Sequence, residues 1–590
     1  AGDVFGNGML LSKHIRLQAA FNHLHIFIDP NPDAAITYPE RERLFNLPRS
    51  SWEDYDKSLI SEGGGVFSRK AKSVKLTPQI QAMLATDKTS MTPNELIQNL
   101  LKMPVDLLWN GGIGTYVKAS QETHSDVGDR ANDVLRINGS ELGAKIVGEG
   151  GNLGMTQKAR IEYALHGGRV NTDFVDNVGG VDCSDNEVNI KVLLNGLVAS
   201  GDLTMKQRNQ ILDQMEDEVG DIVLDDAYTQ AESISVTQWQ GCEQVKSQVR
   251  FIHALEKMDK LDRQLENLPD DETMTEREKQ GVGLTRPELA VLVAYSKMVL
   301  KEQLAVDSVT HQPLYASRLT QYFPTQLREP YHQPMLSHPL KSEIIATSLA
   351  NQVVNEMGAN FVIRLQDETG ASVEQVVNAY SCAREIYDFD GVFHAIRELD
   401  NHVASDVQYE LLVEVRRMIR RGSRWLLRNQ ALSSDLAGVI ARYQADARWV
   451  AEHLDELLVD SEIQEHQEQA QVWIDAGVTV SLAQRLSKLS SLYSAFDIKQ
   501  VAETANVSIE VAAKLYFALG SRLSLHWFLK QINQQSVDNH WQALARASFR
   551  EDLDWQQRQL TTLVLQCGDV KVPQDVSHGL ELWISKNKVA

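Results

Sequence analysis

The stretch Lys145-Ile-Val-Gly-Glu-Gly-Gly-Asn-Leu-Gly-Met-Thr156 begins with a short apolar run and continues into closely spaced glycines. This pattern predicts a strand that ends in a glycine turn and leads into a helix. A second stretch, Asn177-Val-Gly-Gly-Val-Asp-Cys-Ser184, predicts a polar turn that opens another helix. Because ligands of α/β proteins bind where strands end and helices begin, we expect a small polar ligand to bind at this pair of stretches.

Strands and helices alternate around this pair. Apolar runs predict further strands at 25–29, 105–109 and 169–174, with helical patterns between them. Strands that alternate with helices imply a parallel sheet. We therefore predict an α/β, Rossmann-like cofactor domain over residues 1–200. The chain begins inside a glycine-rich turn, so we expect it to be part of a longer protein and this domain to lack its first strand.

The pattern changes after about residue 200. Apolar residues then recur at helical spacing through most of residues 201–590, without a fixed repeat. Thr285-Arg-Pro-Glu288 has the form of a capping box and predicts the start of one of these helices. We predict a mostly helical region of more than one subdomain, whose work is assembly or regulation.

The composition restricts the kinds of partner. The net charge is −22 at pH 7, and a field of this sign repels nucleic acids and acidic membranes. No apolar run reaches the length of about 18 residues that a membrane span requires. Four widely spaced cysteines indicate reduced thiols in a cytoplasmic protein. The histidines and cysteines lack metal-ligand spacing, so we predict no metal site.

Glycines near the start of the chain suggest a dinucleotide site. Gly6 and Gly8 precede a stretch, Met9–Ala20, with apolar residues at helical spacing, and a strand that ends at Asp29 follows. An acid about 20 residues after the glycines is typical of a dinucleotide fingerprint. The alternative is an ordinary glycine turn followed by an ordinary acid at a strand end.

A row of arginines stands out in the helical region. Arg417, Arg420, Arg424 and Arg428 fall on one helix face by their spacing. We favour an interhelical salt-bridge face, because runs of charge are most often of this kind. The alternative is a site for an anion or a regulatory ligand.

The two opening stretches resemble a known family. Glu149-Gly-Gly-Asn152 and Asn177-Val-Gly-Gly-Val181-Asp-Cys-Ser184 are similar to E-G-A-N and N-A-G-G-V-x-x-S in dehydrogenases of the glutamate dehydrogenase type. Gly2-Asp-Val-Phe-Gly-Asn-Gly-Met-Leu-Leu-Ser12, Phe27-Ile-Asp-Pro-Asn-Pro-Asp33 and Gly283-Leu-Thr-Arg-Pro-Glu-Leu289 resemble, more specifically, the large NAD-dependent bacterial glutamate dehydrogenases. The chain differs from the general pattern at Gly151, Gly154 and Val178.

The resemblance implies a role for each matching residue. Gly6 and Gly8 would lie at the pyrophosphate of NAD, and Asp29 would bind its adenosine ribose. Asn110 would follow a strand that passes the cofactor, and Asn152 and Asn177 would contact the nicotinamide end. Val181 would contact the aliphatic part of glutamate, and Ser184 its side-chain carboxylate.

The resemblance also implies a reaction, in which L-glutamate, NAD and water give 2-oxoglutarate, ammonium and NADH. The family's catalytic lysine and aspartate belong to a preceding domain, so we expect no catalytic residue in this chain and no activity of the chain alone. We also expect a homo-oligomer. The alternatives are a non-catalytic helical scaffold with a degenerate nucleotide fold, and a dehydrogenase of an apolar amino acid, which Ser184 disfavours.

Overall fold

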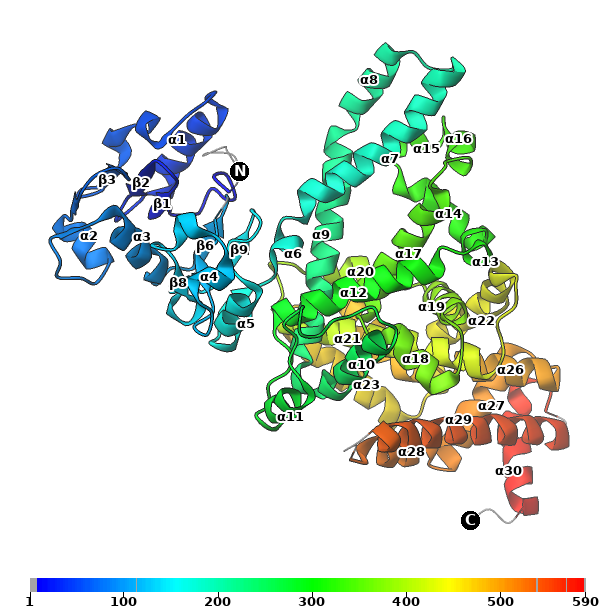
Figure 1. Ribbon diagram of the computed structural model, residues 1–590. Helices are drawn as coiled ribbons and strands as arrows, with labels where there is room; N and C mark the ends of the chain where they lie inside the picture. The colour runs from blue at the N-terminus through cyan, green and yellow to red at the C-terminus, as the bar shows by residue number, and fades with distance from the viewer. Residues whose placement is uncertain (1–7, 113, 537–539, 569, 588–590) are drawn as a thin grey trace. The chain divides into compact units, whose positions relative to one another are not determined.

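The computed structural model describes residues 8–112, 114–536, 540–568 and 570–587 of the chain (Figure 1). The chain forms two compact units. The N-terminal unit contains residues 1–234 and 259–295, and the C-terminal unit contains residues 235–258 and 296–590. The predicted boundary near residue 200 stays a prediction.

All strands of the described chain lie in the N-terminal unit. They are β1 Ala19–Phe21, β2 His25–Ile28, β3 Gly65–Ser68, β4 Val74–Lys75, β5 Ser90–Met91, β6 Leu107–Asn110, β7 Val117–Lys118, β8 Ile137–Asn138, β9 Ile146–Glu149 and β10 Arg169–Val170. They form a three-stranded antiparallel sheet in the order β1-β2-β3, a three-stranded parallel sheet in the order β10-β9-β6, and the two pairs β4-β5 and β7-β8.

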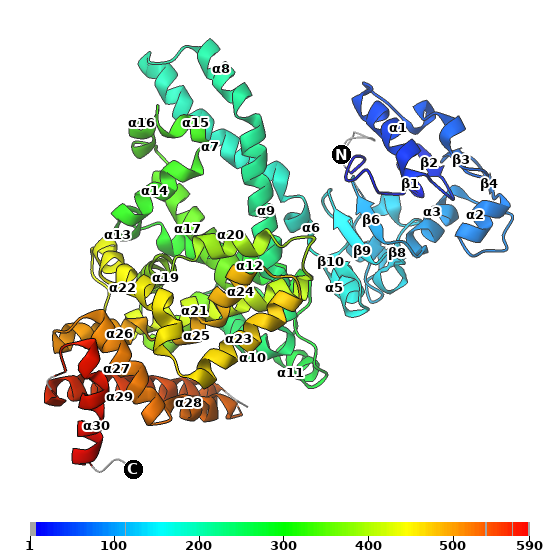
Figure 2. The ribbon, with the colours of Figure 1, turned by 180° about the vertical axis from the view of Figure 1, so that it is seen from behind.

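The parallel sheet contains two of the predicted strands, β6 and β9. These strands lie side by side, and Asn110 is the register partner of Glu149 (Figure 2). The predicted strand 169–174 is shorter than expected, because only β10 is extended and a helical turn begins at Asp173. A single doubly wound sheet is not present among the described residues, so the Rossmann-like fold stays a prediction.

The helices of the N-terminal unit begin at polar caps. They are α1 Ala34–Asn46, α2 Pro78–Met83, α3 Pro93–Lys102, α4 His124–Val127, α5 Gln157–Leu165, α6 Asp173–Asp176, α7 Val178–Ser200, α8 Met205–Gln214 and α11 Asp271–Lys279. The Thr156 side chain accepts a hydrogen bond from the Ala159 amide at the start of α5. Helix α7 ends at Gly201, which has φ = 86° as a left-handed cap requires.

The prediction of a helix over Met9–Ala20 is wrong. The chain forms turns and extended backbone there and enters β1, which pairs with β2. The buried guanidinium of Arg41 explains the difference, because it donates hydrogen bonds to the carbonyls of Met9 (3.0 Å) and Ile15 (3.1 Å). These carbonyls would otherwise accept helical hydrogen bonds, so Arg41 stabilises the irregular path.

The core of the N-terminal unit joins both three-stranded sheets. Ile26 and Ile28 of β2 belong to the same buried cluster as Val147 of β9 and Ala159 of α5. Burial of such side chains stabilises a fold by roughly 1.5–3 kcal/mol each. The antiparallel sheet and the strand ends of β6 and β9 therefore share one hydrophobic core.

Helices make up the rest of the chain. Helices α9 Glu216–Trp239 and α12 Arg286–Leu304 each cross a boundary between the units. The helices of the C-terminal unit are α10 Val245–Lys257, α13 Asp307–Thr310, α14 Pro313–Tyr322, α15 Thr325–Arg328, α16 His332–Leu336, α17 Lys341–Met357, α18 Phe361–Thr369, α19 Val373–Ile386, α20 Asp390–Arg397, α21 Ser405–Arg428, α22 Leu436–Leu457, α23 Asp460–Asp475, α24 Val480–Ser487, α25 Leu489–Leu492, α26 Ala495–Ala505, α27 Ile509–Arg522, α28 Leu525–Gln534, α29 His540–Gly568 and α30 Val576–Asn587. The predicted large helical region is confirmed.

The predicted capping box at the start of α12 is confirmed. The Thr285 amide and hydroxyl both donate to Glu288, each at 2.7 Å.

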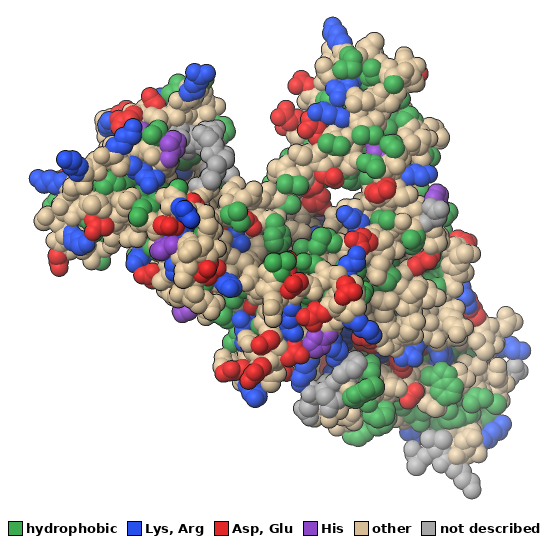
Figure 3. All heavy atoms as spheres, viewed as in Figure 1, with side chains coloured by type: hydrophobic (Ala, Val, Ile, Leu, Met, Phe, Trp, Pro, Cys, Tyr) green, Lys and Arg blue, Asp and Glu red, His purple; other side chains and the backbone are tan. Residues whose placement is uncertain are grey.

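No helix in the described chain combines the length and the apolar character that a membrane span needs. Acidic and basic side chains are interspersed over the face shown in Figure 3.

Candidate functional site

Polar side chains and closely packed glycines meet at the carboxyl ends of β6 and β9. A Cβ atom added to Gly154 would lie 1.6 Å from Nδ2 of Asn110. Gly8 has φ = +89°, and a Cβ atom there would lie 2.0 Å from the Trp109 ring. The Gly151 amide donates to the Asn110 carbonyl at 3.0 Å. Three glycines therefore allow the backbone to approach the end of β6 closely.

Two buried donors at this strand end lack a partner. Nδ2 of Asn110 and Nε1 of Trp109 are buried and make no hydrogen bond among the described residues. A buried donor without an acceptor costs roughly 1–3 kcal/mol. Such groups are strong candidates for contacts with a bound polar ligand.

Asn152 and Asn177 lie together, as the sequence predicted for two residues of one site. Asn152 is in the turn after β9, and Asn177 precedes the first residue of α7. The side-chain Nδ2 of Asn177 donates to Oδ1 of Asn152 at 2.5 Å, and Asn152 is exposed. Two amides that are separated in the sequence are thus presented to solvent at the carboxyl edge of the parallel sheet.

Val181 and Ser184 continue from Asn177 along one face of α7. They follow Asn177 by one and two helical turns, which places the three residues on the same face. Val181 is 70% exposed, and Ser184 is exposed as well. The Ser184 hydroxyl donates to the Gly180 carbonyl at 3.1 Å, so its oxygen is held on the helix surface.

A buried ion pair supports the turn after β9. Arg160 of α5 donates to both carboxylate oxygens of Glu149, at 2.7 and 2.9 Å, and also lies 3.3 Å from Asp173. Burial raises the pKa of Glu149, and the Arg160 guanidinium opposes this shift only in part. Asp173 in turn accepts a hydrogen bond from the Leu153 amide at 2.8 Å, which fixes the residue after Asn152.

Asp176 connects the start of α7 to β9. Its carboxylate accepts hydrogen bonds from the Glu149 amide at 2.9 Å and from the Asn171 side chain at 2.7 Å. Arg286 donates to the same Asn171 side chain at 2.9 Å. Burial raises the pKa of Asp176. The residue before Asn177 is therefore tied to the strand that ends at the site.

The sequence reasoning missed this supporting network. Arg160 follows buried Ala159 and stands one turn before buried Tyr163 on α5. A charged residue at helical spacing from a buried aromatic residue is a signal that could have revealed it. The acids at 173 and 176 gave no comparable signal, because their partners are distant in the sequence.

Asp29 lies in the antiparallel sheet, at the end of β2. It is fully buried, and its Oδ1 accepts hydrogen bonds from the amide (3.2 Å) and the hydroxyl of Ser61. Its other oxygen, Oδ2, is buried without a hydrogen-bond partner among the described residues.

Gly6 lies outside the described residues. The structure thus brings Gly8, Asn110, Asn152 and Asn177 to one sheet edge, with Val181 and Ser184 on the adjoining helix.

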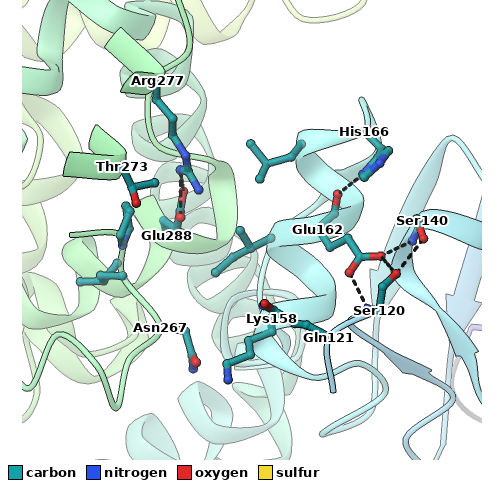
Figure 4. Close-up of a pocket in the computed structure, with 14 residues that line it drawn as sticks. Ser120, Gln121, Ser140, Lys158, Glu162, His166, Asn267, Thr273, Arg277 and Glu288 are labelled. Carbon is teal, nitrogen blue, oxygen red and sulfur yellow. Dashed lines mark hydrogen bonds and ion pairs between the residues drawn. The ribbon is translucent and has the colours of Figure 1, made fainter. Parts of the chain in front are cut away.

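A separate pocket of about 640 Å³ lies beside α5 (Figure 4). Its charged side chains are already engaged in part, since Glu162 accepts hydrogen bonds from Ser120 and Ser140, and Arg277 pairs with Glu288 at 2.9 Å. None of the cofactor- or substrate-binding residues predicted from the sequence lines it. Within the described chain, no group of three or more His, Cys, Asp or Glu side chains could hold a metal ion.

Two family models match the chain. Residues 1–237 match the family described as bacterial NAD-glutamate dehydrogenase, catalytic domain, and residues 281–590 match glutamate dehydrogenase, C-terminal.

Curated relatives match nearly the whole chain. Proteins named NAD-specific glutamate dehydrogenase are 49% identical over 587 residues in Pseudomonas aeruginosa, 46% over 585 in Halomonas elongata and 41% over 575 in Mycobacterium tuberculosis. These matches cover 100%, 99% and 96% of this chain, but only 36%, 36% and 35% of the relatives. The chain thus spans about a third of their length.

Proposed function

Because the chain belongs to the bacterial NAD-glutamate dehydrogenase family, we propose that the protein oxidatively deaminates L-glutamate with NAD, giving 2-oxoglutarate and ammonium. In this proposal the chain binds NAD and part of the glutamate. The observation that carries it is the hydrogen bond between Asn152 and Asn177 at the carboxyl edge of β6 and β9. Ligands of α/β folds bind at this edge.

The residues at the edge suit a dinucleotide. Among the described residues, Asn110 and Trp109 offer two buried donors without partners at this edge, and Asp29, in the antiparallel sheet, offers a buried acceptor without one. A cofactor with phosphates, ribose hydroxyls and a carboxamide carries the complementary groups. The left-handed backbone at Gly8 is one that glycine adopts without strain, and the missing side chain leaves room for the Trp109 ring at the end of β6. When bound, NAD would accept the hydride from the α-carbon of glutamate.

The proposal gives Asn152 and Asn177 a role in orientation. Their amides can donate and accept, so together they can hold a carboxamide or ribose in one position. Precise placement of this kind lowers the barrier to hydride transfer, because the reacting atoms must lie about 3–3.5 Å apart. The resemblance to the family assigns the proton transfers to a lysine and an aspartate, and neither is among the site residues of this chain.

Val181 and Ser184 are proposed to select glutamate. Val181 offers exposed apolar surface for the aliphatic chain, and one helical turn further the Ser184 hydroxyl can donate to the side-chain carboxylate. With an apolar amino acid, this hydroxyl would keep its hydrogen bond to the Gly180 carbonyl and make none to the substrate.

Replacing Ser184 with alanine in the full-length enzyme tests the substrate assignment. A hydrogen bond to a charged group contributes about 1.5–3 kcal/mol, so we expect the KM for glutamate to rise about 10- to 100-fold. The KM for NAD should change much less. Initial rates measured while each substrate is varied give both constants.

Two variants serve as controls for this experiment. Ser184→Thr keeps the hydroxyl and should restore most of the affinity for glutamate. Cys183→Ala changes the exposed neighbour, which points from a different face of α7, and should leave both constants near those of the parent enzyme. Equal increases in the two KM values for Ser184→Ala would contradict the assignment.

Asp29→Ser tests the proposed contact with the adenosine ribose. Loss of the carboxylate removes the Oδ2 acceptor, which has no partner in the part of the chain that the structure describes. We therefore expect NAD to bind about 10-fold more weakly, consistent with one charge-assisted hydrogen bond. The preference over NADP should fall too, because the acid that would repel a 2′-phosphate is gone. Nucleotide binding, followed by fluorescence, measures both affinities without turnover.

Ser61→Ala is the matched control, since it removes one hydrogen bond to Asp29 but leaves the carboxylate in place. This variant should retain the preference for NAD. An unchanged ratio of NAD to NADP affinity in Asp29→Ser would refute the role of Asp29.

A further inference from the structure

The arginine row on α21 is only partly a salt-bridge face. Arg417 pairs with Glu414, and Arg424 pairs with Glu368 at 3.2 Å and with Glu551 at 2.5 Å. Arg428 donates to the Glu368 carbonyl. The interhelical salt bridges favoured from the sequence are confirmed for Arg424, whereas Arg417 pairs within α21 and Arg428 contacts a backbone carbonyl. All these groups belong to the C-terminal unit.

Arg420 does not follow this pattern. It stands one turn before Arg424 on α21 and is only partly exposed. Within the described chain its guanidinium forms neither a hydrogen bond nor an ion pair. An arginine at the centre of a salt-bridge face should have an acidic partner, so another explanation is needed.

Two guanidinium groups hold a single carboxylate, Glu368, whose charge also acts on Arg420. Arg364 of α18 donates to Glu368 at 2.9 Å, and Arg424 donates to the same carboxylate at 3.2 Å. Burial would raise the pKa of Glu368, but the charges of Arg364, Arg424 and Arg420 lower it overall. The charge of Arg364, followed by burial, holds the pKa of Arg420 well below its ordinary value. Since arginine stays protonated in proteins, Arg420 carries a charge that its surroundings oppose.

Two further arginines extend this group toward α29. Arg421 lies over the Tyr493 ring, 3.8 Å from its centroid. Burial, followed by the charges of Arg421 and Arg424, lowers the pKa of Arg550 to about 10. We define the arginine cluster as Arg364, Arg420, Arg421, Arg424 and Arg550.

The arginine cluster has more positive than negative charge. The acids that face it are Glu368, Glu551 and Asp554. Burial, followed by the charge of Asp497, raises the pKa of Asp554 to about 7, so this acid is only partly ionised at neutral pH. Five guanidinium groups thus face at most three negative charges, in a chain whose acidic residues outnumber its basic ones by 80 to 58.

We propose that the arginine cluster binds a small phosphate-bearing anion. A guanidinium presents paired donors that match phosphate oxygens, and several of them around one point favour a multiply charged ligand. A phosphate group with about −1.5 to −2 charge would balance the excess. Arg420 is the residue that such an anion would pair with directly. The site is in the C-terminal unit, and its occupancy does not depend on the proposed dehydrogenase reaction.

Thermal unfolding of the full chain in sodium phosphate and in sodium pyrophosphate tests the proposal. Sodium chloride at the same ionic strength separates specific binding from general screening. An anion that binds the folded state raises its melting temperature, so we expect an upward shift of several degrees in at least one of the two salts. A larger shift in pyrophosphate would indicate a diphosphate group, and an equal shift a single phosphate.

Arg420→Gln should abolish this shift while leaving the melting temperature in chloride equal to or above that of the parent chain. A salt-bridge residue behaves in the opposite way, because its loss leaves a partner unpaired. Arg420→Lys keeps the charge without the paired donors and should reduce the shift. Arg442 of α22 is an exposed arginine that pairs with Glu503 of α26 and is not part of the arginine cluster. Arg442→Gln should therefore keep the full shift in melting temperature.

Three results would overturn the proposal. They are the absence of a shift in the parent chain in both salts, an undiminished shift in Arg420→Gln, and a melting temperature of Arg420→Gln in chloride below that of the parent chain.

Discussion

Replacing Glu149 with alanine should destabilise the N-terminal unit by about 3–5 kcal/mol, because removal of one partner of a buried ion pair leaves the other charge uncompensated. Arg160 is 4% exposed and Glu149 is fully buried, so water cannot replace the lost carboxylate. Asp173, 3.3 Å from the same guanidinium, offsets part of the loss and favours the lower end of the range. Hydrogen–deuterium exchange of the β6 and β9 amides measures the opening of this unit separately from the rest of the chain.

Two controls separate the lost charge from the lost packing. Glu149→Gln keeps the size and one acceptor, and should destabilise less than alanine. Glu149→Leu combined with Arg160→Met removes both charges and should recover most of the stability, since buried ion pairs are often replaceable by apolar pairs of similar volume. The raised pKa of Glu149 agrees with this, because it shows that Arg160 only partly offsets the burial of the carboxylate. A double variant as unstable as Glu149→Ala would contradict the explanation.

Gly154→Ala should lower the NAD-dependent turnover of the full-length enzyme by about 100-fold, the loss expected when a positioning group moves by about 1 Å. The added methyl group would lie 1.6 Å from Nδ2 of Asn110, so the Asn110 side chain must move. Backbone strain is not the cause, because Gly154 has a φ that other residues adopt. The turnover number and the affinity for NAD, measured together, report on the displacement.

The companion variants make this prediction specific. Asn110→Ala should cause a similar loss, and the double variant should be no worse than either single one, because both act through the same side chain. Gly196→Ala places a methyl group in open space on α7 and should leave turnover unchanged. A Gly154→Ala enzyme with the parent's turnover would refute the role of Asn110.

The strands at the site could be predicted because their signals are local. Short apolar runs bounded by turn residues predict strands, and β2, β6 and β9 lie within a few residues of the runs that predicted them. The capping box at Thr285 is a local signal too, and its hydrogen bonds to Glu288 are present. The meeting of Asn152 with Asn177 followed from where the two motifs stand relative to strand ends and helix starts.

The rest depended on contacts between residues far apart in the sequence. The stretch before β1 has helical spacing, but Arg41 binds the carbonyls of Met9 and Ile15, which lie 32 and 26 residues before it in the sequence. No local pattern reveals these contacts. The arginine row on α21 presented a similar difficulty. Which of its members lacks a partner depends on acids that come from α18 and α29, and spacing along α21 carries no information about them.

Helix α7 joins the proposed substrate contacts to a distant part of its unit. Its 23 residues form a rod about 35 Å long at 1.5 Å per residue. A tilt of about 5° at Asn177 therefore displaces the far end by about 3 Å, comparable to the width of an atom. Val181 and Ser184 lie near the end of α7 that follows Asn177, and Gly201 caps the far end. In the proposed function, a small tilt of α7 around a bound amino acid would therefore produce a larger displacement where α7 ends and α8 begins.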